Sequence, residues 1–422
     1  MLTETESGEA SVPVAIGVSS RKKTEQEATQ ADKHSRTLLF VTNSFSYGGS
    51  EKHLLELLRG IQEPGTRVII LCTDSDPFTE RLNSLSLEEV VVQHERSLES
   101  IWDWAQVFRK NKPNAVVLVY GTLWMLPWVA AVAARVAGVP RLYAIHHLMP
   151  QQPAEPLIQT IKSPRDLLRR VFGRRVRKLL FARIPPRICD TTICVSNAVR
   201  DSLVADYGFP MGKMRTIHNG VACREFALKS GDRASVRAAL DVGANDVLLI
   251  CTARLSREKG IDILISAMER ILTRYPFCKC AVVGDGPLGE KLREDIRSRG
   301  LDRQVLLLGF QKDVKPYLSA ADVFVLVSYI EGLPYSVLEA MASGLPCVVT
   351  DVGGNREAVV DRTTGLVIKP GSVDEAVLAI EYLLSHPQER ANMAKAAQRR
   401  ATSEFEIDEK MAEFRRLFLA CE

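Results

Sequence analysis

Two carboxylates eight positions apart, Glu331 and Glu339, hold the most informative chemistry of this chain. Glu331 precedes a predicted helix and Glu339 lies within it. Pro334 suits the first helical turn, because its missing N–H would be unpaired there in any case. A helix N-terminus offers free backbone N–H groups and a partial positive charge, which favour an anionic ligand. Glu331 lies at the mouth of that anion site, and Glu339 points back toward it from about two turns inside the helix.

Neither carboxylate is suited to contact a phosphate directly, because like charges repel. Both are better placed to accept hydrogen bonds from neutral hydroxyl groups. An anion flanked by carboxylates that bind hydroxyls is typical of a sugar nucleotide.

A basic loop supplies cations for the same anion. The strand predicted at 247–252 is followed by Arg254 and Lys259, at the edge where parallel sheets bind ligands. Arginine offers a planar fork to phosphate oxygens and lysine a compact charge. Phosphate binding is favoured over a merely solvated basic loop.

Two further loops follow strands in the first half of the chain. Gly48 and Gly49 open a helix and would let the backbone approach a phosphate closely, although a simple tight turn uses the same residues. His146 and His147 follow the strand predicted at 141–145. A histidine there could have a function, positioning a sugar or acting as a base, or it could be only a hydrogen-bonded polar residue. The functional and the structural interpretation both stay open.

Two motifs are weaker than their patterns suggest. Gly284, Gly286 and Gly289 match the dinucleotide-binding spacing, but the acidic residue expected about 20 positions on is missing, so a tight strand-to-helix turn is favoured. Asp74 and Asp76 could hold a metal and a diphosphate, but helix capping before a proline explains them more simply.

The composition is that of an ordinary globular protein with two domains. The chain has 422 residues, 46% hydrophobic and 25% charged, and a length of this size exceeds one core. A net charge of +4 is too small to predict a nucleic-acid partner. The nine cysteines are scattered in apolar runs without metal-ligand spacing, which predicts buried thiols in a reducing compartment.

Strand-like and helix-like segments alternate from residue 37 onward, which predicts an α/β fold with parallel sheets covered by helices on both faces. The alternation occurs twice, separated by a polar, irregular stretch at 220–246. We therefore predict two Rossmann-like domains facing across a cleft. The predicted strands are 37–42, 67–73, 115–120, 141–145 and 191–195, then 247–252, 279–283, 304–308, 322–327 and 347–350.

Two segments raise the question of a membrane. Residues 115–134 carry no charge over a length that could span a bilayer, but a buried strand followed by an apolar helix is favoured. Lys162–Arg187 contains ten basic residues and one acidic residue among apolar ones, the pattern of an amphipathic helix on an anionic membrane surface. A helix that covers the first domain with a solvated basic face is the alternative.

Taken together, the chain resembles the retaining GT-B glycosyltransferases of family 4, the group 1 type. The resemblance covers nearly the whole chain after a polar tail. It is carried by Gly48–Glu51, His146, Ser196–Val199, His218–Val221, Arg254 with Lys259, Val283–Pro287, Glu331 with Glu339, and Gly344–Gly354.

The resemblance implies a role for each candidate residue. Arg254 and Lys259 bind the donor diphosphate and stabilise it as it leaves. Glu339 accepts from the ribose hydroxyls, and Glu331 from hydroxyls of the donor sugar. Gly48, Gly49 and the backbone at Gly332–Leu333 contact phosphate or sugar, and His146 lies near the transferred sugar, with His147 the less favoured candidate. No metal and no cofactor are expected. Ala222-Cys223 departs from the family, many of whose members have an aspartate there.

It also implies an organisation and a reaction. The expected parts are a disordered tail at 1–36, an acceptor-side domain at 37–219, a nucleotide-sugar-binding domain at 220–404, and a helix at 405–422 returning toward the first domain. The expected enzyme is a retaining hexosyl- or N-acetylhexosaminyl-transferase. Its acceptor would be a saccharide or lipid-linked saccharide of cell-surface polysaccharide synthesis.

Three other functions fit the same architecture: a sugar-nucleotide epimerase, an oxidoreductase using the Gly284 loop, and a non-catalytic protein that binds a nucleotide sugar. The epimerase lacks obvious acid and base residues beyond Glu331, and the Gly284 loop is a weak motif. We expect a cytoplasmic protein, free or peripheral on the inner face of the membrane.

Overall fold

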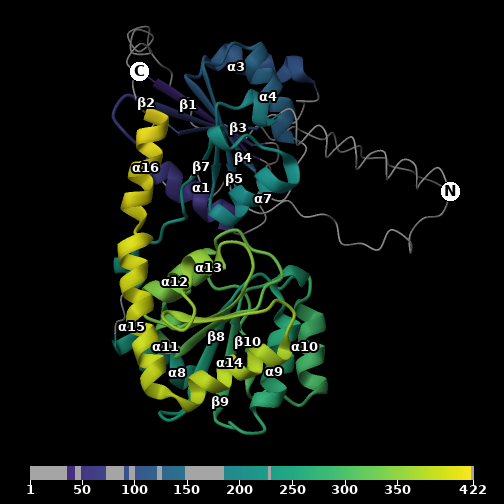
Figure 1. Ribbon diagram of the computed structural model, residues 1–422, viewed down its shortest axis with the longest axis vertical. Coiled ribbons are helices and arrows are strands. Elements are labelled where there is room, and N and C mark those ends of the chain that lie inside the picture. Colours follow the sequence, from purple (N-terminus) through teal and green to yellow (C-terminus); the bar gives the residue numbers. More distant parts are fainter. Residues whose placement is uncertain are drawn as a thin grey trace, which may run out of the picture. The chain divides into compact units, whose positions relative to one another are not determined.

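Runs of buried apolar residues form the strands of two parallel sheets, one in each half of the chain, in a computed structural model (Figure 1). The structure describes residues 36–42, 49–72, 90–94, 100–120, 126–147, 185–226 and 230–419. Residues 1–35 of the predicted tail, Gly48, the Asp74–Asp76 pair and most of Lys162–Arg187 lie outside this part of the chain. The predicted α/β class with parallel sheets is confirmed.

The first sheet has the strand order β3-β2-β1-β4-β5-β6-β7 among the residues that the structure describes. Every neighbouring pair is parallel, and the register sets Leu39 opposite Ile69 on one side and Val116 on the other. Strands buried on both faces explain the uninterrupted apolar runs of the sequence. The strands are β1 (Arg36–Thr42), β2 (Thr66–Cys72), β3 (Val90–His94), β4 (Ala115–Tyr120), β5 (Arg141–His146), β6 (Thr191–Cys194) and β7 (Met214–Thr216).

Local signals explain where the helices of this half begin and end. Ser100 and Asp103 form a reciprocal capping box at the start of α3, and Ser196 caps α7, which ends at Gly208 in the left-handed conformation. The helices are α1 (Gly49–Gly60), α3 (Ile101–Asn111), α4 (Leu126–Val136), α6 (Pro185–Ile188) and α7 (Asn197–Tyr207).

The uncharged stretch at 115–134 forms strand β4 and most of helix α4, as predicted. Strand and helix contact each other, so the apolar sequence is buried within the protein. Among the described helices, none has both the length and the apolar character needed to cross a bilayer.

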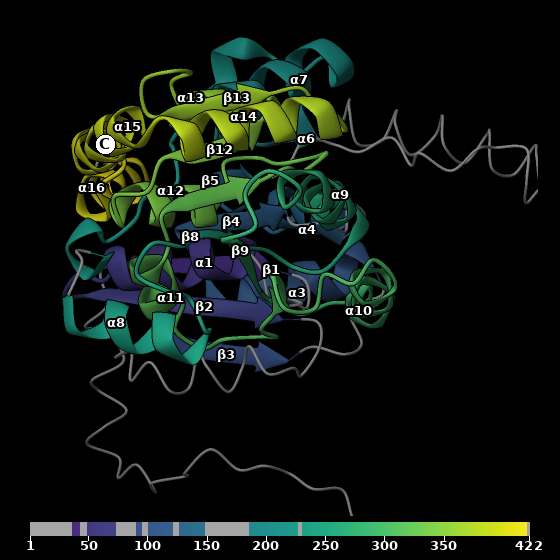
Figure 2. The same cartoon turned by 90° about the horizontal axis from the view of Figure 1, so that it is seen from below.

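The second sheet has the order β10-β9-β8-β11-β12-β13, again with parallel neighbours. Helix α14 lies beside α9 and against β13 (Figure 2). The strands are β8 (Val247–Thr252), β9 (Cys278–Val283), β10 (Val305–Leu307), β11 (Val323–Leu326), β12 (Cys347–Thr350) and β13 (Gly365–Ile368). The helices are α8 (Ser230–Ala239), α9 (Ile261–Ile271), α10 (Gly289–Ser298), α11 (Lys315–Ala320), α12 (Tyr335–Ala342), α13 (Asn355–Ala358), α14 (Val373–Ser385), α15 (Pro387–Glu404) and α16 (Ile407–Leu419).

The sequence predictions missed three strands and one helix. The strands β3, β7 and β13 all form sheet edges, and each has five residues or fewer. Helix α8 lies in the stretch predicted to be irregular. Its Arg233 and Arg237 bind Asp322, so polar contacts rather than an apolar stripe hold this helix in place.

Two segments pass side by side between the halves. Val221 donates its N–H to the carbonyl of Phe405 at 2.8 Å, and Ile407 donates to the carbonyl of Val221 at 3.1 Å. A Cβ added at Gly220 would lie 2.8 Å from the Cα of Ile407, so the close passage needs a glycine. Residues 36–422 form one compact unit.

The last helix, α16, completes the core of the first half. Its residues Met411, Phe414 and Phe418 are buried in the same apolar cluster as Phe40 and Leu54 of β1 and α1. The carbonyls of Leu417 and Leu419 also accept hydrogen bonds from Tyr143 and Arg36, at 3.0 and 2.6 Å.

Seven cysteines of the described part of the chain are buried and free, as the sequence predicted: Cys189, Cys194, Cys223, Cys251, Cys278, Cys280 and Cys347. Burial raises the pKa of the Cys189 and Cys251 thiols to about 12. These thiols are therefore inert packing groups at neutral pH.

We predict that Phe414→Ala lowers the free energy of unfolding by about 3–5 kcal/mol, because it leaves a cavity between α16 and the first sheet. Urea unfolding followed by circular dichroism measures the loss. The matched control is Phe277→Ala, since Phe277 is 65% exposed and its removal leaves no cavity. Equal stability of the two variants would show that α16 contributes little to that core.

Candidate functional site

Two loops at the carboxyl edge of the second sheet are held together by their backbones. Tyr329, after β11, donates its N–H to the carbonyl of Glu258, after β8, at 2.8 Å. Gly260 adopts a positive φ of 63°, and a Cβ there would lie 2.3 Å from the carbonyl oxygen of Val327. Only glycine permits this approach. As a result, the basic loop lies directly against the loop that carries Glu331.

Two of the predicted site residues, Lys259 and Glu331, meet at this junction. Lys259 Nζ lies 2.7 Å from Glu331 Oε1, and the Glu331 residue is only 3% exposed. Ser328 Oγ donates to the same oxygen at 2.7 Å, and the carbonyl of Ser328 accepts from Thr350 Oγ1 at 2.6 Å. Both contacts to the carboxylate fall on Oε1, and Oε2 makes no hydrogen bond to the described residues. Oε2 is therefore the oxygen that can take a hydroxyl donor from a ligand.

The second carboxylate, Glu339, lies within α12 as predicted, although Pro334 caps that helix and Tyr335 begins it. Glu339 is 7% exposed and forms an ion pair with Lys52 of α1. Lys52 was not predicted, because no local sequence pattern pairs two residues 287 positions apart.

Gly332 and Leu333 lie in a tight backbone junction. A Cβ added at Gly332 would lie 1.8 Å from the carbonyl oxygen of His147, so the two loops touch through their main chains. The carbonyl of Gly332 accepts from the N–H of Gly354 at 2.5 Å, and the carbonyl of Leu333 accepts from Asn219 Nδ2 at 2.7 Å. These contacts fix the position of Glu331 and of the start of α12.

Buried imidazoles line the adjoining part of the first half. His53 Nδ1 contacts Asn219 Oδ1 at 2.9 Å and the Tyr335 hydroxyl at 3.1 Å, and its ring meets that of His147 at 4.7 Å between centroids. Burial, with a smaller contribution from His147, holds the pKa of His53 well below its usual range. The same causes lower the pKa of His146 to about 3. Both rings are therefore neutral at pH 7, and His146 would act as a hydrogen-bonding group rather than as a cation.

His147, which the sequence made the less favoured candidate, is the histidine whose backbone lies against Gly332. The ring of His146 packs edge-on against Phe209, 5.8 Å between centroids.

Gly49 begins α1 and faces Tyr335, since an added Cβ would lie 3.7 Å from its ring. Arg254 follows β8 and is exposed. The structure thus brings Lys259, Glu331 and Gly332–Leu333 together. It pairs Glu339 with Lys52, a residue that was not predicted.

The Gly284 loop forms the tight turn that was favoured for it. Gly284 has a φ of 142°, and an added Cβ would lie 2.0 Å from the carbonyl oxygen of Ala253. Gly286 is similarly close to Leu255, whose N–H donates to the carbonyl of Asp285 at 3.0 Å. The glycines serve the packing of two neighbouring loops.

Glu357, on α13, also escaped the sequence predictions. Its carboxylate accepts from the N–H groups of Asn197 and Ala198, each at 2.8 Å, and from His218 Nε2 at 2.8 Å. Burial would raise the pKa of Glu357, but the hydrogen bonds from His218 and the two amides outweigh it and lower that pKa. A carboxylate of the second half thereby caps α7 of the first half.

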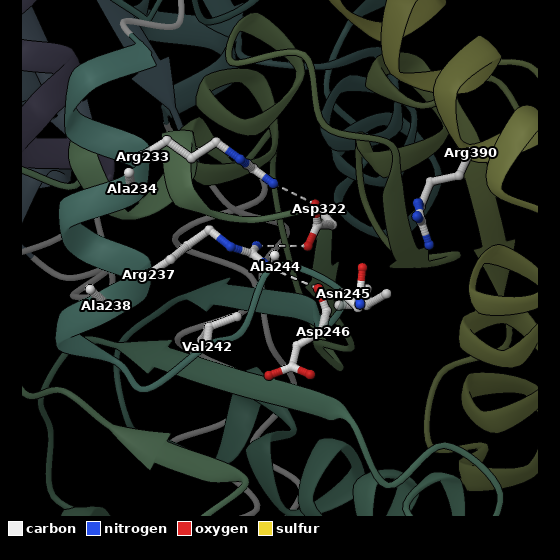
Figure 3. Close-up of a pocket in the computed structure, with 11 residues that line it drawn as sticks. Arg233, Ala234, Arg237, Ala238, Val242, Ala244, Asn245, Asp246, Asp322 and Arg390 are labelled. Atoms are coloured by element: carbon white, nitrogen blue, oxygen red, sulfur yellow. Dashed lines mark hydrogen bonds and ion pairs between the residues drawn. The ribbon is translucent and has the colours of Figure 1, made fainter.

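A hollow of about 530 Å³ lies at the opposite, amino edge of the second sheet (Figure 3). Arg233 and Arg237 line it and bind Asp322, which precedes β11. Arg237 also donates to the carbonyls of Gly243 and Asp246, each at 2.8 Å. These arginines hold α8 and the start of β8 together, so the hollow is a structural junction. Over the described ranges, no group of three or more His, Cys, Asp or Glu residues is arranged to hold a metal ion.

Comparison with known proteins decides the family. The model of glycosyl transferases group 1 matches residues 232–400, and that of glycosyltransferase family 4 matches residues 47–225. The chain is a group 1 glycosyltransferase of the family 4 type. The family 4 match covers most of the first sheet, and the group 1 match covers the second. The fold is GT-B, as predicted.

The name of one relative of this glycosyltransferase states its donor and acceptor, and that of another does not. An Escherichia coli UDP-Gal:alpha-D-GlcNAc-diphosphoundecaprenol alpha-1,3-galactosyltransferase is 26% identical over 78% of this chain and 85% of its own length. An uncharacterized glycosyltransferase of Methanocaldococcus jannaschii, MJ1607, is 29% identical, over 46% of this chain and 50% of its own length.

Solved structures show the same fold. Anabaena Alr3699/HepE in complex with UDP has a TM-score of 0.75 at 22% identity, covering 90% of this chain and 99% of its own. The lipopolysaccharide outer core galactosyltransferase WaaB, in its apo form, has a TM-score of 0.64 at 16% identity, over 91% and 99% of the two chains.

We predict that Gly332→Ala lowers the free energy of unfolding by about 1–3 kcal/mol, because the new methyl group overlaps the carbonyl oxygen of His147. Sugar transfer should fall with it, since Glu331 moves. Thermal unfolding and a donor-turnover assay measure the two effects. Gly212→Ala is the control, because a Cβ there has no heavy atom within 4 Å. Normal stability in Gly332→Ala would contradict the close backbone contact.

Proposed function

We propose that this glycosyltransferase moves a sugar from a nucleotide-diphosphate-sugar donor to a hydroxyl acceptor with retention of configuration. The observation that carries the proposal is the buried pair of Lys259 and Glu331 at the carboxyl edge of the second sheet, with the start of α12 beside it. The pair supports the proposal because Lys259 could stabilise a leaving phosphate while Glu331 accepts from a sugar hydroxyl through Oε2.

The donor would be bound by residues of both halves. Arg254 and Lys259 bind the diphosphate and stabilise its charge as it leaves. Glu331 accepts from hydroxyls of the donor sugar and Glu339 from those of the ribose. Gly48, Gly49 and the Gly332–Leu333 backbone contact phosphate or sugar, and His146 lies near the transferred sugar. The names of the Escherichia coli relative and of the Anabaena structures make UDP-sugars the first donors to test.

Retention follows from attack on the face that the diphosphate leaves. The acceptor oxygen bonds to the anomeric carbon as the bond from that carbon to the phosphate oxygen breaks. The hydroxyl proton passes to the departing phosphate oxygen, so no strong protein base is required. The neutral His146 suits this scheme as a hydrogen-bonding group. Positioning and electrostatics would supply the rate, without a metal.

We expect Lys259→Ala to lower kcat by about 10²–10³-fold, because the developing phosphate charge loses a preorganised cation. The assay incubates UDP-, GDP- and ADP-sugars with saccharide acceptors, with and without a chelator, and measures free nucleoside diphosphate. Lys291→Ala, an exposed site on α10, is the control.

Each outcome of this assay has a meaning. Diphosphate release that needs an acceptor and withstands the chelator supports the proposal. An epimerised donor points to an epimerase, and binding without turnover to a non-catalytic protein. Near-normal transfer by Lys259→Ala would remove Lys259 from the diphosphate site.

The acceptor is proposed to be a saccharide or a lipid-linked saccharide of cell-surface polysaccharide synthesis, and the transferred group a hexose or N-acetylhexosamine. The name of the Escherichia coli relative specifies a diphosphoundecaprenol-linked acceptor. The basic segment Lys162–Arg187 would bring this glycosyltransferase to an anionic membrane surface, where such acceptors lie.

A vesicle experiment tests this membrane contact. The protein should co-sediment with anionic vesicles far more than with neutral ones, and less as the salt concentration rises, because basic residues are screened. Replacing Arg169, Arg170, Arg174 and Arg175 by glutamine should abolish the difference. Equal partitioning onto both kinds of vesicle would contradict it.

A further inference from the structure

Lys52 occupies a cation-binding niche beside the candidate donor site. Its ammonium pairs with Glu339 and lies 5.4 Å from the ring centroid of Tyr335 and 5.6 Å from that of Phe226. A carboxylate and two aromatic faces all favour a cation. The Lys52 side chain is 36% exposed, whereas that of Glu339 is 9% exposed, so the lysine enters from the open side.

Lys52 pairs with one oxygen of Glu339, Oε1. Under the proposed function, on which this inference rests, Glu339 accepts hydrogen bonds from the ribose hydroxyls. Two neighbouring ribose hydroxyls that donate to both carboxylate oxygens compete with Lys52 for Oε1. Binding of the ribose in this way releases the ammonium group inside the site.

The charges of the site show what the released cation would do. Among the residues proposed for the donor, Arg254 and Lys259 are cations, and Glu331 and Glu339 are carboxylates. Lys52 adds one further positive charge to this set. A diphosphate needs positive surroundings when it leaves bulk water, so the added charge favours its binding.

The geometry allows the lysine to move between the two partners. Lys52 lies in the first turn of α1, which begins at Gly49, and Gly49 faces Tyr335 at the start of α12. The anion end of α12 is thus close to the base of the Lys52 side chain. A lysine carries its charge on a flexible four-carbon stem, so rotation of the side chain is enough.

We propose that Lys52 is a third cationic ligand of the donor diphosphate, held on Glu339 while the site is empty and released to the phosphates when the ribose takes that carboxylate. Lys52 is thus a binding residue contributed by the first half of the chain. It couples recognition of the ribose to recognition of the diphosphate.

The chain offers a matched control lysine. Lys315 lies over the same Phe226 ring, 5.9 Å from its centroid, and pairs with Glu225 at 3.1 Å. Its side chain is 38% exposed, nearly as much as that of Lys52. The two lysines differ in their carboxylate, because Glu225 belongs to no part of the donor site.

The test compares ligands with and without phosphates. Uridine, guanosine and adenosine and their diphosphates are titrated against wild type, Lys52→Met and Lys315→Met by calorimetry, and by ligand-observed NMR for the weaker nucleosides. We expect Lys52→Met to weaken binding of the preferred diphosphate by about ten- to hundredfold, the effect of one hydrogen bond to a charged group. Its nucleoside affinity should stay equal or rise, because Glu339 no longer holds a competing cation. Lys52→Arg should restore most of the diphosphate affinity, and Lys315→Met should match wild type.

Other results would overturn the proposal in distinguishable ways. Equal losses for nucleoside and diphosphate would mean that Lys52 only orients Glu339, and unchanged affinities would remove it from the site. Absence of any diphosphate binding by wild type would overturn the proposed function itself, and the inference with it. If Lys52→Met does not fold, Glu339→Gln tests the exchange instead. Nucleoside binding to Glu339→Gln should weaken, while the factor by which the diphosphate binds more tightly than the nucleoside should stay the same or grow. Loss of that factor would contradict the exchange.

Discussion

Direct contact between main chains at the carboxyl edge of the second sheet is the constraint on which the rest of the site depends. Gly260 lies against Val327, Gly332 against His147, and Gly353 against the carbonyl of Glu331, where an added Cβ would lie 2.1 Å away. Loops joined in this way cannot shift independently, because any side chain at these positions would collide with a peptide group. The backbone contacts therefore set the positions at which the carboxylate of Glu331 and the ammonium of Lys259 meet. Such fixed positions are what electrostatic stabilisation of a leaving group requires.

Three carboxylates, Glu331 and Glu339, which are buried, and Glu357, which is half-buried, each have a cation or several N–H groups as partners. Glu331 has Lys259, Glu339 has Lys52, and Glu357 has two amides and His218. Two of these three contacts join residues of the first half to residues of the second. A buried carboxylate without such partners would destabilise the fold by several kcal/mol. The partners of Glu331 and Glu339 are the groups that a donor would have to share or replace.

The sequence predicted most of the fold and the second half of the site. Parallel strands with continuous apolar runs, such as β4 and β8, can be recognised in the sequence, and so can polar side chains placed directly after such strands. Edge strands such as β7 carry too few apolar residues to be recognised. Lys52, Asn219 and Glu357 were missed for a different reason: each meets a partner more than a hundred residues away, and no local pattern marks such a pairing.

The return of α16 to the first sheet has a consequence for the order in which the chain acquires its structure. Phe414 and Phe418 complete an apolar cluster whose other members lie in the first half. During synthesis the ribosome releases β1 and α1 long before these residues exist, so that cluster stays open until the whole second sheet has emerged. The second half completes its core with α15, which precedes α16 in the chain, so it need not wait for α16. An exposed apolar face waiting for its last helix is the kind of surface that chaperones hold.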